Sequence, residues 1–314
     1  MQIRGKTGKL SARKGRMTLS QWQLWSMMII PIILIFIFCY IPMGGIIIAF
    51  KDYKFNLGIL GSKWVGLANF EYFFKGNDFW RVTRNTLSLN FLMISIGMVC
   101  AVGYATLLFE TLGKRNVKVY QTIAIVPNFI SWVIVGYISY TFLHPQSGLV
   151  NRIIELFGGK AVDWYSTPKA WPVILTLFNV WKCIGMDSVI YYATLMGIDS
   201  GLYEASALDG ANKWQQFIYI TLPQLSSVII VILILKIGGI FRSDFGLFYQ
   251  LTRDCGVLYE TTDVMDTYIY RTMRVFGDMS TSSAMGLLQS VVGFVMVIIT
   301  NTIVSKVDSD KAMF

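Results

Sequence analysis

Apolar residues are concentrated in six long runs that alternate with shorter polar segments. The runs extend over Leu24–Phe50, Thr86–Phe109, Tyr120–Leu143, Trp171–Leu195, Leu225–Phe241 and Ala284–Val304. A helix that crosses the hydrocarbon core of a bilayer needs about 20 apolar residues at roughly 1.5 Å per residue. The pattern therefore predicts an all-α integral membrane protein with six transmembrane helices.

The composition supports this fold class. Of the 314 residues, 54% are hydrophobic and only 14% are charged, whereas a soluble domain carries about 25% charged residues. The chain cannot cover a water-exposed surface of normal size, so we expect most of it to lie in lipid. Its net charge of +9 is typical of the basic cytoplasmic ends of a membrane protein, and nucleic acid is not expected as a partner.

Basic residues before the first apolar run predict the orientation. Residues 1–23 hold six basic residues and no acidic one, and such a segment stays in the cytoplasm. Six spans then return the C-terminal tail, residues 306–314, to the same side. We expect a multi-pass protein of the cell membrane with a transmembrane domain over residues 24–305 and both termini cytoplasmic. On the outer side, Gly148–Gly158 has apolar residues at helical spacing and predicts a short helix on the membrane surface.

Few residues could support catalysis or metal binding. The four cysteines form no Cys-x-x-Cys pair, and His144 is the only histidine in the chain, so no zinc site is indicated. The sequence also lacks the G-x-x-x-x-G-K-[ST] loop that binds the phosphates of ATP. We therefore predict a protein that is not an enzyme, with no catalytic residue, no metal ligand and no cofactor of its own.

A polar segment between the fourth and fifth runs, residues 199–223, has the features of a bent pair of helices. Ser200 can cap a short helix, and Gly210 is unfavourable inside a helix and predicts a bend. After the bend, Trp214 and Phe217 lie at helical spacing, and Pro223 can begin the next span. We call residues 199–223 the elbow. By itself such an elbow is either a docking surface or a plain connection, and connections are commoner.

The elbow resembles the signature E-A-A-x-x-D-G-A-x-x-x-x-x-F-x-x-I-x-L-P of ABC importer permeases. Only Ser206 departs from it, where a small residue replaces the second alanine. Other stretches are similar to maltose-type sugar permeases, especially the subgroup for polysaccharide and oligosaccharide uptake: 127–133, 148–151 and 163–164. The resemblance covers about residues 20–305. The elbow residues that it implies in coupling to an ATPase are Glu204, Ala205, Ser206, Asp209, Gly210, Ala211, Trp214, Phe217, Leu222 and Pro223.

This resemblance also implies a fold and a set of partners. The fold is that of type I ABC importer permeases, with six transmembrane helices and a cytoplasmic coupling helix. The partners are a second, homologous permease, two cytosolic ATP-binding subunits and an extracellular solute-binding protein, typically a lipoprotein. ATP and Mg²⁺ are bound by the ATPase subunits. The permease itself contributes no catalytic residue. Its role is to make different contacts in the outward-open and inward-open states.

Polar and aromatic residues inside the spans are candidates for the substrate path, because such groups are costly in lipid. Aromatic faces suit the apolar faces of sugar rings, and amides suit hydroxyl groups. For any single aromatic residue, packing between helices is the commoner role. The candidates are Asn128, Trp132, Tyr137, Tyr140, Asn179, Trp181, Lys182, Asp187, Lys236 and Ser243.

Lys182 and Lys236 raise the question of substrate charge, since each lies about a dozen residues into a predicted span. Asp187 is poorly placed to pair with Lys182 on one helix, and Asp244 is too distant from Lys236 to pair directly. Two cations facing a water-filled cavity could bind a carboxylate such as a uronate. The alternative is that the lysines pair with acids or carbonyls of the partner permease or bond neutral hydroxyls.

Three functions are consistent with these observations. The first is the transmembrane permease of an ATP-driven importer for oligosaccharides, acidic if the lysines face the substrate. The second is a permease of the same architecture for another solute, such as an amino acid or a peptide. The third is a membrane enzyme or a secondary transporter. The sequence has neither a histidine cluster nor a pair of intramembrane carboxylates, which argues against the enzyme, and loss of uptake on ATP depletion would argue against the secondary transporter. The elbow signature favours the first.

Overall fold

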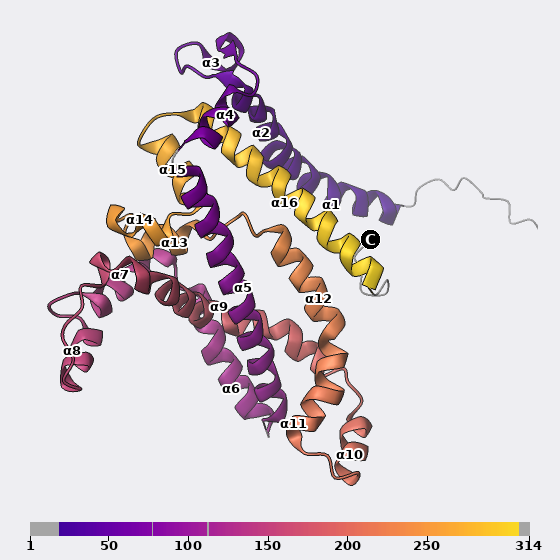
Figure 1. The fold of residues 1–314 in the computed structure, drawn as a ribbon. Coiled ribbons are helices and arrows are strands. Elements are labelled where there is room, and N and C mark those ends of the chain that lie inside the picture. The colour runs from indigo at the N-terminus through magenta and orange to yellow at the C-terminus, as the bar shows by residue number, and fades with distance from the viewer. Residues whose placement is uncertain (1–18, 77, 112, 308–314) are drawn as a thin grey trace, which may run out of the picture. The chain divides into compact units, whose positions relative to one another are not determined.

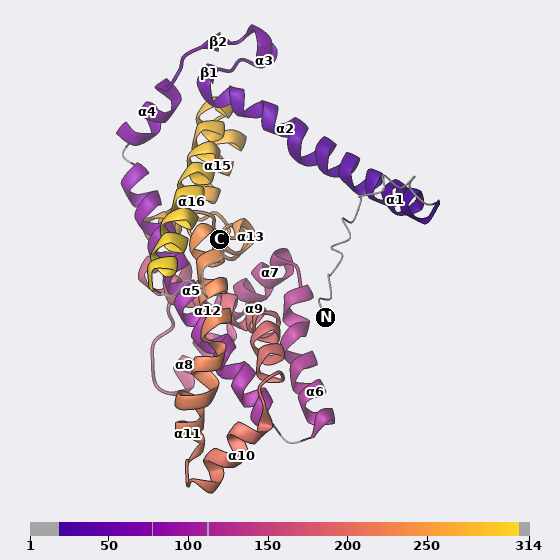
Figure 2. The ribbon, with the colours of Figure 1, turned by 90° about the vertical axis from the view of Figure 1, so that its right-hand side faces the viewer.

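The computed structural model describes residues 19–307 except 77 and 112. The cytoplasmic ends predicted from charge therefore lie almost wholly outside the described residues. Contacts divide the chain into two units, the first ending at Ile47 and the second beginning at Ile48. Figures 1 and 2 show that both are built almost entirely of helices.

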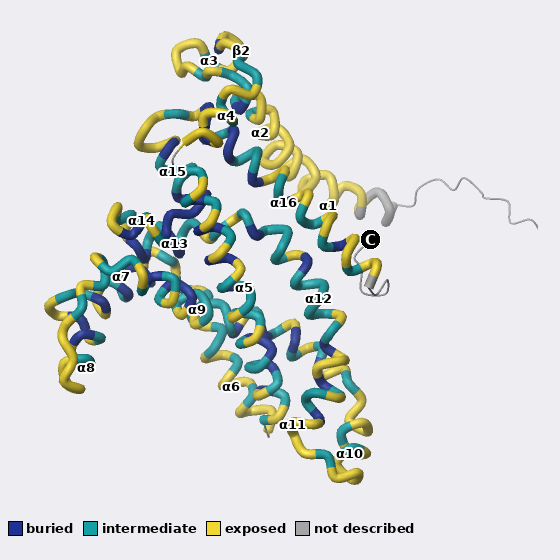
Figure 3. The backbone as a smooth tube through the Cα atoms, in the orientation of Figure 1, coloured by how far each residue is buried: buried dark blue, intermediate teal, exposed yellow. Residues whose placement is uncertain are grey.

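The first unit is one long apolar helical stretch. Helix α1 (Leu19–Ile35) continues into the π-helical turn η1 (Phe36–Tyr40) and α2 (Ile41–Met43). The 3₁₀ helix η2 (Gly44–Phe50) follows and runs into the second unit. Large apolar side chains along this stretch are exposed (Figure 3), which fits the lipid-facing surface expected of the first predicted span.

Four long helices form the framework of the second unit: α5 (Asp78–Glu110), α9 (Trp171–Leu195), α12 (Leu222–Gly238) and α16 (Met279–Val307). Among the described residues, five helical stretches are long and apolar enough to cross a membrane, and one bent pair raises the number to six. The six-helix expectation is therefore confirmed, with a correction to the third span.

The third span is not one straight helix. It is broken into α6 (Lys114–Ile125), the 3₁₀ helix η3 (Val126–Phe129) and α7 (Trp132–Leu143), and α7 leaves at 96° to the first part. Pro127 at the break has no N–H to continue the helical ladder. The side chain of Ser131 then caps α7 by accepting a hydrogen bond from the Ile134 N–H at 3.4 Å.

The fifth span begins earlier than its hydrophobicity predicts. The helical stretch runs over Lys213–Gly238 instead of Leu225–Phe241. It consists of α11 (Lys213–Gln216), the π-helical turn η6 (Phe217–Thr221) and α12. Pro223 lies in the first turn of α12, immediately after the π turn. The wider turn accommodates a residue that lacks an N–H, so the proline does not mark the start of the span.

Shorter elements join the long helices. The expected helix within Gly148–Gly158 is confirmed as α8, although its position relative to a membrane stays a prediction. The remaining elements are β1 (Lys51–Asp52) and β2 (Lys63–Trp64), which pair antiparallel, α3 (Gly58–Gly61), α4 (Ala68–Lys75), α8 (Leu149–Leu156), η4 (Trp164–Ser166), η5 (Pro168–Ala170), α10 (Ser200–Leu208), α13 (Phe245–Thr252), η7 (Gly256–Leu258), α14 (Tyr259–Thr262) and α15 (Met265–Arg274).

Two of the three apolar clusters among the described residues of the second unit bear on the candidate sites. One joins α5, α7, α9 and α13 around the buried side chains of Trp171 and Phe248. The other joins α5, α9 and α12 and includes Ala101 and Ala105 beside Tyr191. Small residues four apart on one helix let a neighbouring backbone approach closely, which favours packing between membrane helices. The two clusters position α13 and the elbow, which carry the candidate sites.

Candidate functional site

The elbow lies at one end of the second unit, opposite α4 and α15 (Figures 1 and 2). Its first helix, α10, is capped by Asp199, whose carboxylate accepts a hydrogen bond from the Gly201 N–H at 2.9 Å. The prediction that Ser200 is the cap was wrong by one residue. The bend at Gly210 is confirmed: its φ is +84°, and a Cβ placed there would meet no atom within 4 Å. Glycine is needed for this backbone conformation and not for space.

Most of the predicted coupling residues of the elbow lie on its surface. Trp214 is 67% exposed and stacks on Phe217 at 5.6 Å between ring centroids, and Leu208 is 90% exposed. Ser206, Ala211 and Phe217 are half-buried, whereas the other predicted residues are exposed: Glu204, Ala205, Asp209, Gly210, Trp214, Leu222 and Pro223. The elbow thus presents large apolar side chains beside charged ones at one end of the second unit.

Residues that the signature does not include fix the shape of the elbow. Gln216 is buried, and its side-chain amide donates to the Tyr203 carbonyl at 3.1 Å and to Ser206 Oγ at 2.9 Å. The Tyr203 hydroxyl lies 3.0 Å from the Thr221 hydroxyl. Lys213 pairs with Glu110 at the end of α5 at 2.6 Å. These contacts tie α10, α11 and α5 together and hold the elbow against the end of α5. The structural role of these residues could be recognised only from tertiary contacts and not from the sequence.

Lys182 does not face open space. It is 6% exposed, and its ammonium donates to the carbonyl oxygens of Pro127, Asn128 and Ile130 at 3.2, 2.8 and 2.6 Å. The ammonium also lies 5.1 Å from the centroid of the Trp132 ring. All three N–H donors of the lysine are thereby used at the break between α6 and α7. The interpretation that Lys182 is a free cation for an acidic substrate is wrong.

Lys236 has a partner within this chain as well. Its ammonium lies 3.0 Å from an Asp187 carboxylate oxygen, and the pair joins α12 to α9. Lys236 is in the last turn of α12, so the expectation that it lies in the middle of a span was also wrong. Hydrophobicity had placed that span several residues too far along the chain. The pairing between different helices was missed because only intrahelical partners can be judged from spacing.

A pocket of about 170 Å³ lies between α5, α9, α12 and α13. It brings Asn179 and Lys236 together, with Asp187 beside the lysine. Sequence reasoning missed Asn90, which lines the pocket and donates to the Ile240 carbonyl at 2.7 Å and to Ser243 Oγ at 2.9 Å. The remaining lining residues are Met93, Ile94, Gly239, Arg242, Asp244 and Leu247. We call this the amide pocket.

A second pocket, of about 190 Å³, lies between α7 and α13. Of its lining residues, Tyr137 and Tyr140 are among the path candidates. The others are Val133, Gly136, Tyr249, Gln250 and Arg253. We call this the tyrosine pocket. Its lining residues come from α7 and from α13 with the residue that follows it. These two segments are far apart in the sequence, so no local motif could reveal the whole pocket.

The other aromatic candidates are placed differently. The Trp132 indole N–H donates to an Asp244 carboxylate oxygen at 2.6 Å, and Asp244 also lines the amide pocket. Trp132 therefore lies at the border of that pocket. Trp181 instead lines an apolar hollow with Ile138, Phe142, Leu177 and Phe178, which assigns it to packing or lipid contact. Asn128 contributes its backbone carbonyl to Lys182.

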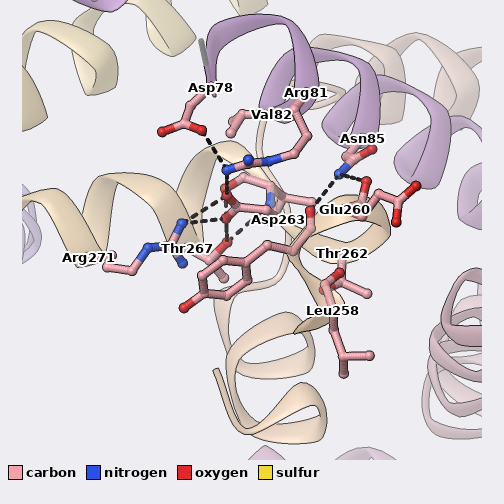
Figure 4. A network of polar contacts seen from close by, with 12 residues as sticks. Asp78, Arg81, Val82, Asn85, Leu258, Glu260, Thr262, Asp263, Thr267 and Arg271 are labelled. Carbon is pink, nitrogen blue, oxygen red and sulfur yellow. Dashed lines mark hydrogen bonds and ion pairs between the residues drawn. The ribbon is translucent and has the colours of Figure 1, made fainter. Parts of the chain in front are cut away.

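A buried ionic network fastens the segment between the fifth and sixth spans to α5 (Figure 4). The Asp263 carboxylate is fully buried and accepts from Arg81 at 3.0 Å and from Arg271 at 2.8 Å for each oxygen. Arg81 also pairs with Asp78 at 2.8 Å. Burial by itself lowers the pKa of Arg271, but the attraction of Asp263 outweighs it and raises the pKa above the ordinary value. This network holds the end of α14 against α5 and α15.

Within the described residues, no group of three or more His, Cys, Asp or Glu side chains could hold a metal ion. The second unit therefore has an exposed elbow at one end and two polar pockets, one near the start and one near the end of α13.

Comparison with known proteins places this arrangement in context. Residues 93–309 match the family model for a binding-protein-dependent transport system inner membrane component. The polygalacturonan/rhamnogalacturonan transport system permease protein YteP of Bacillus subtilis is 36% identical over 288 residues, 92% of this chain and 89% of that protein. Protein LplB of the same organism is 35% identical over 285 residues, 90% of this chain and 89% of that protein.

Solved structures with the same fold cover nearly the whole chain. A chain of a bacterial ABC transporter involved in the import of the acidic polysaccharide alginate has a TM-score of 0.83 and 34% identity, over 92% of this chain and 97% of that one. The bacterial alginate ABC transporter in complex with an alginate pentasaccharide-bound periplasmic protein gives a TM-score of 0.82 and 34% identity, over 92% and 96%.

Proposed function

Because this chain belongs to the family of binding-protein-dependent transport system inner membrane components, we propose that it forms the membrane path of an importer for oligosaccharides derived from acidic polysaccharides. It is a multi-pass membrane subunit of an ABC importer and not an enzyme. Beyond this, we propose which substrate it carries, which residues line the path and which subunits it assembles with.

One observation carries the choice of substrate. The match to the transporter for the acidic polysaccharide alginate extends over 92% of this chain at 34% identity. A second relative, of similar sequence identity, is a permease protein of a polygalacturonan/rhamnogalacturonan transport system. Permeases that share the fold and a third of their residues over the full length are expected to have closely related paths. An oligosaccharide is therefore favoured over an amino acid or a peptide.

In this proposal the elbow is the docking surface for a cytosolic ATPase subunit. Its exposed apolar side chains, above all Trp214 and Leu208, would be covered in the complex. The internal bonds of Gln216 and the Lys213–Glu110 pair make the elbow stiff enough to push on α5 and α12. ATP and Mg²⁺ are held by the two ATPase subunits, and this chain contributes no catalytic group.

The amide pocket is the first proposed saccharide contact, and it lies where α12 ends between α5 and α9. The amides of Asn90 and Asn179 line it and offer donors and acceptors for hydroxyl groups. The Asp187–Lys236 pair lies at its edge and joins two spans. If α9 and α12 move relative to each other, this ion pair and the pocket change together. The contacts to the saccharide would then differ between the outward-open and inward-open states, as alternating access requires.

The complete assembly in this proposal contains one copy of this chain, a second and different permease, two ATPase subunits and an extracellular solute-binding protein. The N- and C-termini and the elbow then face the cytoplasm, where the ATPases are. The basic residues before the first span support that orientation.

The test is reconstitution of the complete complex in proteoliposomes with its binding protein. We expect ATP hydrolysis and uptake to be stimulated by acidic oligosaccharides carried by the binding protein. Stimulation by amino acids or peptides instead of saccharides would contradict the proposed substrate. A stable, transporting complex that contains two copies of this chain and no second permease would contradict the proposed assembly.

A further inference from the structure

Arg253 stands out in the tyrosine pocket because its guanidinium is exposed and has no carboxylate partner among the described residues. Its Cζ lies 4.1 Å from the centroid of the Tyr140 ring. Stacking on the ring orients the planar cation and leaves the N–H groups at its edge free to donate. A cation held in this way is available to an anionic ligand.

The neighbouring acid, Asp254, does not neutralise Arg253. Its carboxylate accepts from the Tyr259 hydroxyl at 2.8 Å and pairs with Arg271 at 3.3 Å. Burial raises the pKa of Tyr259 to about 12, so its hydroxyl stays protonated and remains a donor. Arg271 is in turn fixed by Asp263 in the buried ionic network. The acid beside Arg253 is thus committed to other partners.

The backbone at these two positions is unusual. Arg253 and Asp254 have φ angles of +56° and +50°, which residues with a Cβ rarely adopt. Such strain persists only where the surrounding structure enforces it, and it is often found at functional sites. Here the bonds of Asp254 hold the turn, and the turn ends α13 so that Arg253 lies in the pocket instead of continuing the helix.

The rest of the pocket has the composition of a saccharide site. Tyr137 is 67% exposed, and Tyr140 and Tyr249 provide two further aromatic rings, with the Gln250 amide beside them. Aromatic rings pack against the apolar faces of sugars, while a few polar groups fix their orientation. The wall is rigid, because a Cβ on Gly136 would lie 2.8 Å from the Gln250 carbonyl oxygen.

We propose that the tyrosine pocket is a second saccharide subsite, in which Arg253 binds a carboxylate of the sugar and the tyrosines stack on its ring. This inference rests on the proposed function and names a cation that favours acidic saccharides in this subsite. Neither lysine identified in the sequence can do so, since Lys182 and Lys236 are both paired within the chain.

The two subsites lie along one helix. Asp244, which caps the start of α13, lines the amide pocket, and Arg253, just beyond its end, lines the tyrosine pocket. Nine residues at a helical rise of 1.5 Å separate them by about 14 Å. An oligosaccharide that contacts both subsites would have to extend over at least this distance.

The experiment measures binding of tri-galacturonate and of its methyl ester to the complete complex in nanodiscs, without binding protein. The two ligands have the same sugar rings and linkages, and in the ester each carboxylate charge is replaced by a neutral methyl ester. We expect the wild type to bind the acid more tightly than the ester. Arg253→Gln should raise the Kd for the acid about tenfold, as expected for loss of a charged hydrogen bond, and leave the Kd for the ester unchanged. Arg253→Lys should fall between. Arg152→Gln, an exposed arginine on α8, serves as the matched control and should behave like the wild type.

Two results would overturn the inference while leaving the proposed function intact: an unchanged Kd for the acid in Arg253→Gln, or equal weakening of acid and ester. A third would do the same: if removing anionic lipid from the nanodiscs tightens binding of the acid to the wild type but not to Arg253→Gln, the arginine binds a lipid headgroup. If the wild type binds neither saccharide, and its transport is stimulated by none, the proposed function fails and the inference fails with it.

Discussion

Replacement of Lys182 by methionine tests whether this lysine supports the fold or contacts the substrate. Methionine keeps most of the length and the apolar part of the side chain but removes the ammonium. The carbonyl oxygens of Pro127, Asn128 and Ile130 would then lose a charged donor at 2.6 to 3.2 Å. We expect a loss of stability at the break between α6 and α7 and no specific loss of substrate preference.

The size of the effect follows from these contacts. A hydrogen bond to a charged group contributes about 1.5 to 3 kcal/mol. The three bonds share one ammonium and are not additive, and the variant leaves neutral carbonyl oxygens unpaired instead of a charge. Removing the donor should therefore cost about 1.5 to 3 kcal/mol in total. For a chain of this size such a loss lowers the midpoint of thermal unfolding by on the order of 5 °C.

The assay compares thermal unfolding of the purified complex with its ATPase stimulation by acidic and neutral oligosaccharides. Lys182→Gln, which retains two donors, should lie between the wild type and Lys182→Met in stability. Lys75→Met removes an exposed lysine paired with Glu71 at 2.6 Å and should leave the unfolding midpoint unchanged. If Lys182→Met unfolds like the wild type but loses the preference for acidic saccharides, the lysine contacts substrate and the structural reasoning is refuted.

Three further substitutions test the elbow, the interhelical pair and a buried acid. Gly210→Val should insert normally but uncouple uptake from ATP hydrolysis, because a β-branched residue at φ +84° costs at least about 1 to 2 kcal/mol. Gly210→Asn should retain coupling. Normal uptake by the valine variant would contradict the role of the bend. Lys236→Met should lower the midpoint of thermal unfolding because it leaves Asp187 unpaired. The double variant with Asp187→Asn should regain most of the lost thermal stability. If the double variant regains none, the ion pair does not contribute to stability. Burial raises the pKa of Asp266 above its ordinary value of 3.8, so its contribution to stability is fully present below that value and is lost as pH rises through the raised pKa. Asp266→Asn should therefore gain stability relative to the wild type as pH rises towards neutrality, measured as unfolding midpoints across that range, and parallel pH profiles would contradict this.

Several features could be predicted from the sequence because they depend on local patterns. Apolar runs of about 20 residues identify spans, since every such run must leave water. The elbow signature and the glycine bend at Gly210 are also local, because a positive φ depends on the residue itself. The absence of a phosphate-binding loop and of a histidine cluster can be read directly from the chain.

The boundaries of the spans were harder to predict. Pro127 and Pro223 look alike as helix breakers, yet one lies at a 96° bend and the other follows a π turn within a continuing helix. The difference depends on what satisfies the freed backbone groups. At the bend that partner is Lys182, from a helix more than fifty residues away in the sequence.

The roles of the charged residues were decided by the tertiary structure alone. The sequence determined that two lysines lie among apolar residues and that burying them unpaired is costly. It did not determine that Lys182 binds three carbonyls, that Lys236 meets Asp187, or that Asp254 turns to Arg271 and leaves Arg253 free. An ionic or hydrogen-bonding partner is selected by distance and direction in space. Separation along the chain gives these only within a single helix, and every one of these contacts joins different elements.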